Sequence, residues 1–154
     1  MSDIGAAPGA AIDPLRAYPF KVAFPGPEVV GHFTRISGLG MKIAPIRYRE
    51  GGIGPTVRNL TGPVEYTPVT LSYGLTDSRA LFDWIQAVAR GGRLADVQKN
   101  VSIVMLAEDD STERMRWDLI RCWPTTWRGA FLDALSAEAA IEELTLVYEG
   151  LERR

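Results

Sequence analysis

The chain has 154 residues, 46% of them hydrophobic, with a formal net charge of −2 and an isoelectric point of about 5.5. This size suits a single domain over residues 1–154, and the acidic balance argues against sequence-specific recognition of nucleic acid. No run of 18 apolar residues is present, so we expect no membrane-spanning segment, and the N-terminus lacks the pattern of a secretory signal. The single cysteine, Cys122, excludes a disulfide within the chain and favours a reducing compartment.

The first half of the chain predicts three strands. Residues 1–14 are small and proline-containing, and we expect them to be flexible or ordered only in an assembly. Strands are predicted at residues 18–24, before a Pro-Gly-Pro sequence, and at residues 29–36. At residues 67–73, Val69, Leu71 and Tyr73 alternate with polar neighbours or proline, which is typical of a half-buried strand.

One helix is predicted between residues 77 and 92. Its apolar side chains recur at helical spacing and form one stripe, made by Leu81, Trp84, Ile85 and Val88. Asp77 or Ser78 is expected to cap the first turn with a side-chain oxygen. Gly91 and Gly92 are expected to end the helix, because glycine adopts the left-handed conformation without strain.

The second half predicts a hairpin and a closing strand. Strands at residues 100–107 and 113–123 flank the polar residues 108–111, and Pro124 is expected to interrupt the second strand. Residues 139–151 read as a last strand that places Leu144, Leu146 and Tyr148 on one face, after a connector at residues 133–138. We therefore predict a mainly β fold, an antiparallel β-barrel or β-sandwich with one flanking α-helix.

Residues 38–66 form an arm with strand-like pattern but too little apolar content for a core of its own. Residues 35–58 carry five bases and one acid, a net charge of +4, whereas residues 129–150 carry five acids and no base, a net charge of −5. These stretches are either two solvated faces or complementary patches that meet between subunits.

The residues that could carry chemistry do not form a catalytic, cofactor-binding or metal site. His32 is the only histidine and lies within a predicted strand, so a catalytic triad has no support. No cluster has metal-ligand spacing, and the glycine-rich residues 37–40 and 51–54 match neither a P-loop nor a dinucleotide-binding loop. The sequence thus favours a structural or binding role over an enzyme.

The chain resembles the inner tail-tube proteins of contractile phages and phage-like contractile injection systems. The resemblance runs from about residue 13 to residue 152 and rests on the order of several short segments rather than on one motif. These segments are Asp13-Pro14-Leu15, Phe20-Lys21-Val22, Phe33–Leu39, Tyr48–Gly52, Val69-Thr70-Leu71, the helix with Leu81, Phe82 and Trp84, Trp117–Pro124 and Ile141–Gly150. Trp123 departs from the pattern, because a small residue is expected before that proline.

The resemblance implies a β-barrel with a flanking helix that forms hexameric rings, which stack into a hollow tube with a lumen for cargo or DNA. It implies no catalysis and no cofactor. The implied partners are further copies of the chain, a surrounding sheath protein, baseplate and cap proteins, and a luminal cargo or tape-measure protein. The protein would be assembled in the cytoplasm and carried in a virion or phage tail-like particle, including an extracellular one.

Three alternatives stay open: a minor paralogue that caps the tube or joins it to the baseplate, a carrier like the type VI secretion tube, and a small ligand-binding barrel.

Within the resemblance, the arm is the expected bridge between subunits. We hypothesise that its bases meet the acidic patch near the C-terminus of a copy in the adjacent ring. The interface residues would be Lys42, Arg47, Tyr48, Arg49, Glu50, Arg58, Glu142, Glu143 and Glu149. Reversing Arg47 and Arg49 to glutamate is then expected to change tube length or yield.

Overall fold

The computed structural model describes residues 19–25, 33–49, 51–52, 54–75, 77–109 and 111–154. These residues form nine strands, one α-helix and one short 3₁₀ helix. The elements in chain order are β1 Phe20–Ala23, β2 Phe33–Ser37, β3 Met41–Tyr48, β4 Arg58–Tyr66, β5 Val69–Gly74, α1 Ala80–Ala89, η1 Leu94–Asp96, β6 Lys99–Leu106, β7 Glu113–Arg128, β8 Ile141–Val147 and β9 Gly150–Arg153. The predicted first residues of the 29–36 strand and the flexible segment 1–14 lie outside the described part, as do His32 and Glu50.

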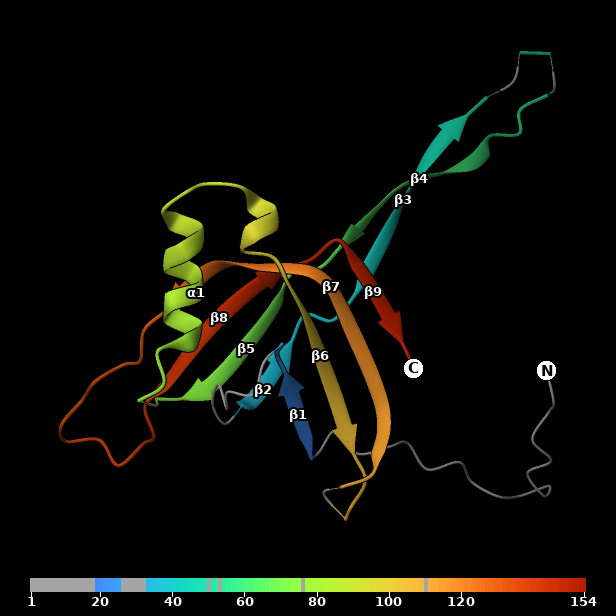
Figure 1. Ribbon diagram of the computed structural model, residues 1–154. Helices are drawn as coiled ribbons and strands as arrows, with labels where there is room; N and C mark the ends of the chain where they lie inside the picture. Colours follow the sequence, from blue (N-terminus) through green and yellow to red (C-terminus); the bar gives the residue numbers. More distant parts are fainter. Residues whose placement is uncertain (1–18, 26–32, 50, 53, 76, 110) are drawn as a thin grey trace, which may run out of the picture.

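The long strand β7 joins two antiparallel sheets (Figure 1). Strands β1, β6, β7 and β9 form one sheet, and β7, β8, β5 and β2 form the other. The described strands follow the path β1-β6-β7-β8-β5-β2, and β1 and β2 at its two ends do not pair with each other. The mainly β, antiparallel fold with one helix is therefore confirmed as a sandwich-like arrangement, and no closed barrel is formed by the described strands.

β7 changes sheets at Arg121. This residue has a φ of 53°, the left-handed conformation that side chains other than glycine rarely adopt. Its backbone N–H donates to Asn100 Oδ1 at 3.0 Å, and its guanidinium pairs with Glu149 at 3.1 Å. These contacts hold the bend at which β7 leaves β6 and β9 and begins to pair with β8.

The prediction that Pro124 interrupts this strand is wrong. β7 continues to Arg128, and Pro124 is buried opposite Leu146 of β8. A bulge between Pro124 and Thr126 shifts the register of the β7–β8 pairing. Proline lacks a backbone N–H, and a position beside a bulge is one where a strand tolerates this. The predicted single strand at 139–151 is also two strands, because β8 ends at Val147 and β9 turns back to pair with β7.

The core lies between the sheets and the helix. The predicted alternation is confirmed, because Val69, Leu71 and Tyr73 on β5 are buried, and so are Leu144, Leu146 and Tyr148 at the C-terminal end. Leu71 and Leu144 lie directly opposite each other in the β5–β8 register. Burial of each such side chain stabilises the fold by about 1.5–3 kcal/mol.

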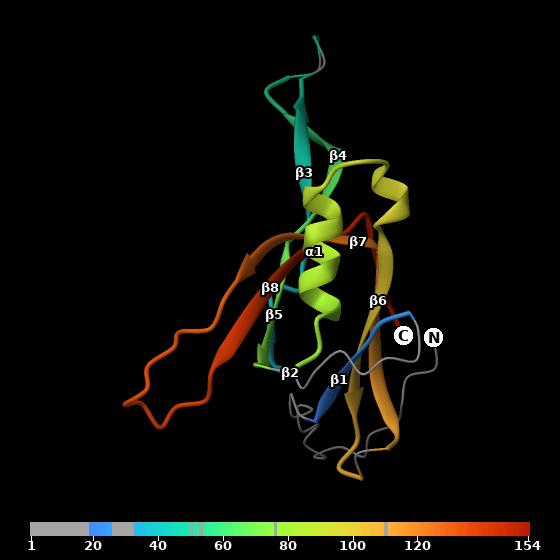
Figure 2. The ribbon, with the colours of Figure 1, turned by 60° about the vertical axis from the view of Figure 1, so that its left-hand side comes forward.

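Helix α1 covers this core with the predicted stripe (Figure 2). Leu81 and Trp84 are buried, and the Trp84 indole N–H donates to the Val97 carbonyl oxygen at 2.6 Å. The predicted cap is wrong in position. The N-cap is Arg79, whose side chain makes no capping hydrogen bond, and Ser78 Oγ accepts from the Ala80 N–H at 3.5 Å. The predicted end of the helix is confirmed, since the glycines at 91 and 92 both have positive φ.

The predicted hairpin at residues 100–123 is confirmed by the antiparallel pairing of β6 with β7. Asp109 orders the turn by accepting from the Ser111 and Thr112 backbone N–H groups at 3.0 and 2.9 Å. These hydrogen bonds hold the pKa of the Asp109 carboxyl well below its usual range. Asp110 lies outside the described residues.

Candidate assembly surfaces

The arm is a β-hairpin that stands away from the two sheets (Figures 1 and 2). β3 and β4 pair only with each other among the described strands, with Ile43 opposite Val64 and Ile46 opposite Leu60. The sequence indicated strand character but not this pairing. A two-stranded ribbon is marginal by itself in water, so its stability depends on what contacts it.

Hydrogen bonds at the base of the hairpin fix it to the end of β8. The Thr67 N–H donates to the Gly40 carbonyl oxygen at 3.0 Å. The Tyr148 hydroxyl donates to the Thr67 carbonyl oxygen at 2.7 Å and lies 3.3 Å from the Gly40 carbonyl oxygen. The rings of Tyr66 and Tyr148 pack with centroids 5.4 Å apart. The hairpin therefore leaves the core in a defined direction.

Gly38 is required at the start of the hairpin. Its φ is 94°, and a side-chain carbon there would overlap the Pro68 carbonyl oxygen. We predict that Gly38→Ala lowers the free energy of unfolding by about 1–3 kcal/mol, as expected for backbone strain. Urea denaturation measures this change, with Gly74→Ala as the control because a carbon added at Gly74 meets nothing within 4 Å. Equal loss in both variants would contradict the prediction.

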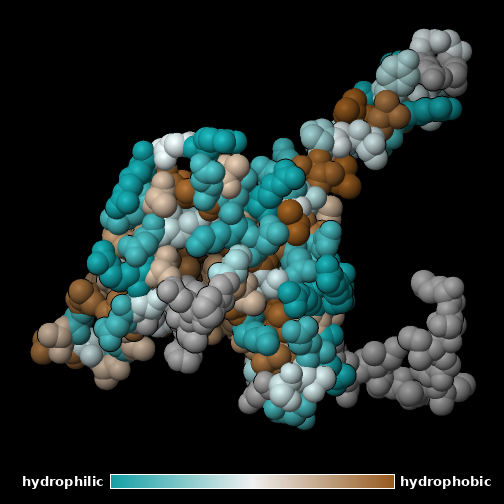
Figure 3. Space-filling model, in the orientation of Figure 1, coloured by the Kyte–Doolittle hydropathy of each residue, from teal (hydrophilic) through white to brown (hydrophobic). Residues whose placement is uncertain are grey.

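Both faces of the hairpin expose large apolar side chains. Seven such residues are each 43–53% exposed: Met41, Ile43, Ile46, Tyr48, Val57, Leu60 and Val64. A bulge between Ile43 and Pro45 places the extra residue in β4, so β3 keeps its alternation. Ile43 and Ile46, three residues apart on β3, then point to opposite faces. In Figure 3 this part of the molecule shows brown, hydrophobic surface away from the body. Apolar surface of this kind marks an interaction site.

The arm bases are exposed and have no ion-pair partner within the described part of the chain. They are the four residues Lys42, Arg47, Arg49 and Arg58. Tyr48 lies opposite Arg58 in the hairpin register. The structure thus places the bases on one projecting element, and within the chain none of them forms an ion pair with Glu142, Glu143 or Glu149.

The predicted acids lie on or beside β8 and contact their own chain. Glu149 pairs with Arg121 at 3.1 Å, and Glu143 lies 3.7 Å from Arg128. Glu142 lies near Tyr73, where burial together with this carboxylate raises the pKa of the Tyr73 hydroxyl. Pairing of these acids with the arm of another copy stays a prediction, and two of the three carboxylates already have a partner.

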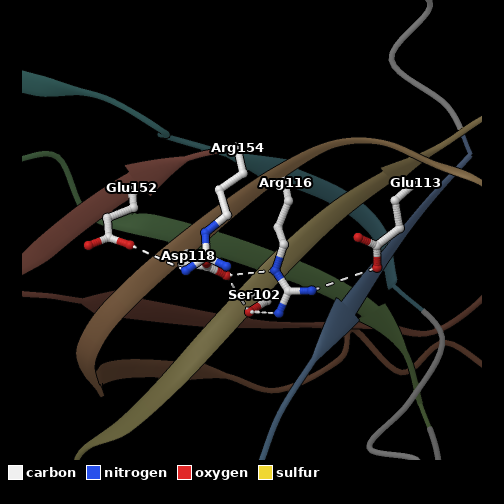
Figure 4. A network of polar contacts seen from close by, with 6 residues as sticks. All are labelled: Ser102, Glu113, Arg116, Asp118, Glu152 and Arg154. Atoms are coloured by element: carbon white, nitrogen blue, oxygen red, sulfur yellow. Dashed lines mark hydrogen bonds and ion pairs between the residues drawn. The ribbon is translucent and has the colours of Figure 1, made fainter.

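A polar network around Asp118 joins three strands (Figure 4). The Asp118 carboxylate, 8% exposed, accepts from Ser102 Oγ at 2.6 Å and from Arg116 Nε at 2.9 Å. Arg154 Nε lies 3.4 Å from the same carboxylate, and its backbone exchanges two hydrogen bonds with Arg116. The network therefore fixes the last residues of the chain to β7 and β6, which is a structural role.

The hydrogen bond from Ser102 and the Arg116 guanidinium hold the pKa of Asp118 below its usual range. Because the folded-state pKa lies below the unfolded value of about 3.9, acidification protonates the unfolded chain first. The contribution of Asp118 to stability is therefore present above about pH 4 and is lost as the pH falls through the folded-state pKa.

We predict that Asp118→Asn lowers the free energy of unfolding at neutral pH by about 1.5–3 kcal/mol, the range for hydrogen bonds to charged groups. Denaturant unfolding between pH 3 and 7 measures this, and the variant should lose less stability on acidification than the parent. The control is Glu113→Gln, whose carboxylate lies 3.7 Å from Arg116 and is exposed. A parent and variant with the same pH dependence would contradict the role of Asp118.

The other candidates for chemistry that the structure describes do not form a site, and His32 lies outside the described residues. Cys122 is buried, and burial raises the pKa of its thiol to about 12, so it packs as a small apolar side chain. Within the described residues, no group of three or more potential ligands could hold a metal ion. No helix in that part of the chain has the length and apolar character to cross a membrane.

The sequence matches a known protein family over most of its length. Residues 16–152 match the family model described as T4-like virus tail tube protein gp19. The chain belongs to this tail-tube family. Its members are structural tube proteins rather than enzymes, and the protein is accordingly a tail-tube component of a contractile injection system or phage particle. None of the curated proteins matches the sequence.

Solved tail-tube relatives share both the fold and the length. A chain in the anti-feeding prophage cap, the tube terminating cap, is 25% identical with a TM-score of 0.80, covering 94% of this chain and 93% of that one. A chain in the extended sheath-tube complex of the PVC extracellular contractile injection system is 26% identical with a TM-score of 0.76, covering 92% and 91%. A chain in the 6-fold symmetrised anti-feeding prophage baseplate is 25% identical with a TM-score of 0.73, covering 94% and 97%.

Proposed function

We propose that this protein is the repeating subunit of the inner tube, with six copies in each ring and rings stacked around a lumen for cargo or DNA. The observation that carries this proposal is the projecting hairpin. Its two faces expose apolar side chains, and its bases form no ion pair within the described residues. Six-fold symmetry is supported by the symmetrised baseplate that contains a similar chain.

The physical argument for assembly starts from exposed apolar surface. A ribbon with apolar side chains on both faces gains most when another subunit covers both faces. Among the described strands, β1 and β2 each have one edge that pairs with no other strand, and such an edge offers backbone hydrogen bonds to a neighbour. A contact between two different surfaces, repeated from copy to copy, forms a closed ring when the rotation between successive copies adds up to a full turn. When it does not, the same kind of contact gives an open filament along an axis. Permanent contacts of this kind bury more than about 2,000 Å².

The comparisons support three of the proposed partners, the sheath, the cap and the baseplate. The similar chain in the sheath-tube complex supports a surrounding sheath, and the cap and baseplate structures support contacts at the two ends of a tube. A luminal cargo or tape-measure protein would fill the tube. The predicted contact between the arm bases and Glu142, Glu143 and Glu149 of a neighbouring copy belongs to this proposal, with Tyr48 and Glu50 on the same arm.

A terminating cap is the second candidate, because a chain of the anti-feeding prophage cap has a TM-score of 0.80 to this chain. A cap subunit forms a ring but does not let further rings add to it. The two roles therefore differ in whether the purified protein elongates.

The experiment is light scattering and negative-stain microscopy of the purified protein over a range of concentrations. The proposal predicts rings at low concentration and tubes of increasing length at high concentration. Rings that never elongate would favour the cap. A protein that stays a 16.9 kDa monomer at every concentration would contradict both roles.

A further inference from the structure

The loop between β7 and β8, residues 129–140, presents a second apolar surface. Phe131 is 85% exposed, Leu132 76% and Leu135 98%, which are the highest values for large apolar side chains in the described chain. The sequence predicts only a connector at residues 133–138 and does not identify this surface. Three large apolar residues within five positions of a loop were the available signal.

Hydrogen bonds within the loop give it a defined shape. Asp133 Oδ1 accepts from the Leu135 N–H at 3.0 Å, and the Asp133 carbonyl oxygen accepts from the Ser136 N–H at 3.1 Å. Ser136 Oγ then accepts from the Glu138 N–H at 3.1 Å. The apolar side chains are therefore carried on a turned backbone and not on an irregular tail.

The loop and the hairpin project from opposite ends of the molecule (Figures 1 and 2). Brown surface appears at both ends in Figure 3. A head-to-tail contact between copies needs two different surfaces of this kind, because the front of one subunit meets the back of the next.

The charges of these two surfaces are complementary. The loop carries Asp133 and Glu138 and no base, and neither acid forms an ion pair within the described residues. The hairpin carries four bases that form no ion pair within the described residues, with Glu65 opposite Lys42 in the register. Glu143 and Glu149, in contrast, already pair with arginines of their own chain. The loop acids are thus better placed to meet the bases of another copy.

We propose that the 129–140 loop is the surface on which the hairpin of a neighbouring copy docks. Phe131, Leu132 and Leu135 cover apolar side chains of the hairpin, and Asp133 and Glu138 face its bases. This inference rests on the proposed tube function and names the surface that receives the hairpin.

Site-specific cross-linking of the assembled full-length protein tests the contact. Leu135→Cys combined with Leu60→Cys places one thiol on each surface, and the buried Cys122 does not react. A short bismaleimide is expected to give a ladder of linked chains in assembled protein, and the ladder should disappear after dilution to monomer. The matched control pairs Leu135→Cys with Arg90→Cys at the end of the helix, which should give no ladder.

A charge exchange supplies a second readout. Glu138→Arg is expected to raise the concentration needed for assembly at least about tenfold, because like charges at an interface are costly. Adding Arg47→Glu should restore assembly, which a merely unfolded variant would not do. Thermal melting of the monomer checks that each variant folds.

The outcomes separate this inference from the proposed function. A parent protein that never assembles contradicts the tube role itself. A different set of results overturns only the loop as the docking surface. In that case the parent protein forms tubes, Leu135→Cys with Leu60→Cys gives no ladder, and Glu138→Arg assembles at the same concentration as the parent.

Discussion

Replacing Ile46 and Leu60 by threonine is expected to abolish tube formation while leaving the monomer folded. The two residues lie opposite each other in the hairpin, are 50% and 49% exposed, and belong to no core cluster. Threonine keeps strand propensity, so the hairpin should persist. Each substitution is expected to remove about 1–2 kcal/mol of apolar stabilisation from each contact between subunits. This is less than the stabilisation from burying a fully exposed side chain, because both residues are already about half-buried in the monomer.

Sedimentation and negative-stain imaging measure the assembly of this variant, and thermal melting measures its folding. Leu94→Thr is the matched control, because Leu94 is 43% exposed but lies in the short 3₁₀ helix away from the hairpin. The control should assemble like the parent. Tubes of parental length at parental concentration from the double variant would show that the hairpin does not carry the contact.

Leu144→Ala should act in the opposite way, by unfolding the monomer. Leu144 is fully buried and lies opposite Leu71 in the core register. Shortening it leaves a cavity, and we expect a loss of about 2–5 kcal/mol in the free energy of unfolding. Assembly should fail only because too little folded protein is present.

Urea denaturation of the monomer measures this loss, and Leu132→Ala is the control. Leu132 is exposed in the 129–140 loop, so its truncation should change stability by less than about 0.5 kcal/mol. A parental midpoint for Leu144→Ala would contradict the assignment of the core. Together, the two variants and their controls distinguish residues that stabilise the folded monomer from residues that form contacts between subunits.

The sequence predicted the core well because local periodicity reports burial. Val69, Leu71 and Tyr73 alternate with polar residues or proline, and Leu81 and Trp84 follow helical spacing, so each pattern names the face that is buried. Nothing in these patterns depends on which strand lies next to which. The mainly β class with one helix followed from the order of such segments.

The sequence did not predict features that depend on distant partners. β7 continues past Pro124 because β8 provides a bulged register there, and no local signal reports that pairing. The closed barrel is not confirmed, because β1 and β2, at the two ends of the described strand order, do not pair with each other. The turn after Val147 likewise depends on β9 reaching β7.

The assembly surfaces were predicted only in part. The bases of the arm were visible as an excess of charge, and the structure places them on a projecting hairpin. The acids predicted to meet them rest on an acidic excess near the C-terminus, and this pattern does not show that Glu143 and Glu149 pair with arginines of their own chain. Contacts between copies leave no pairing signal within one chain, so their partners remain proposals.

A helical reconstruction of tubes assembled from the purified protein would show directly what covers the hairpin. We expect rings of six subunits in which each hairpin is covered on both faces by neighbouring copies, with Ile46 and Leu60 buried. Tubes in which the hairpin projects freely into solvent, or assemblies held together without it, would contradict the role of the hairpin in assembly.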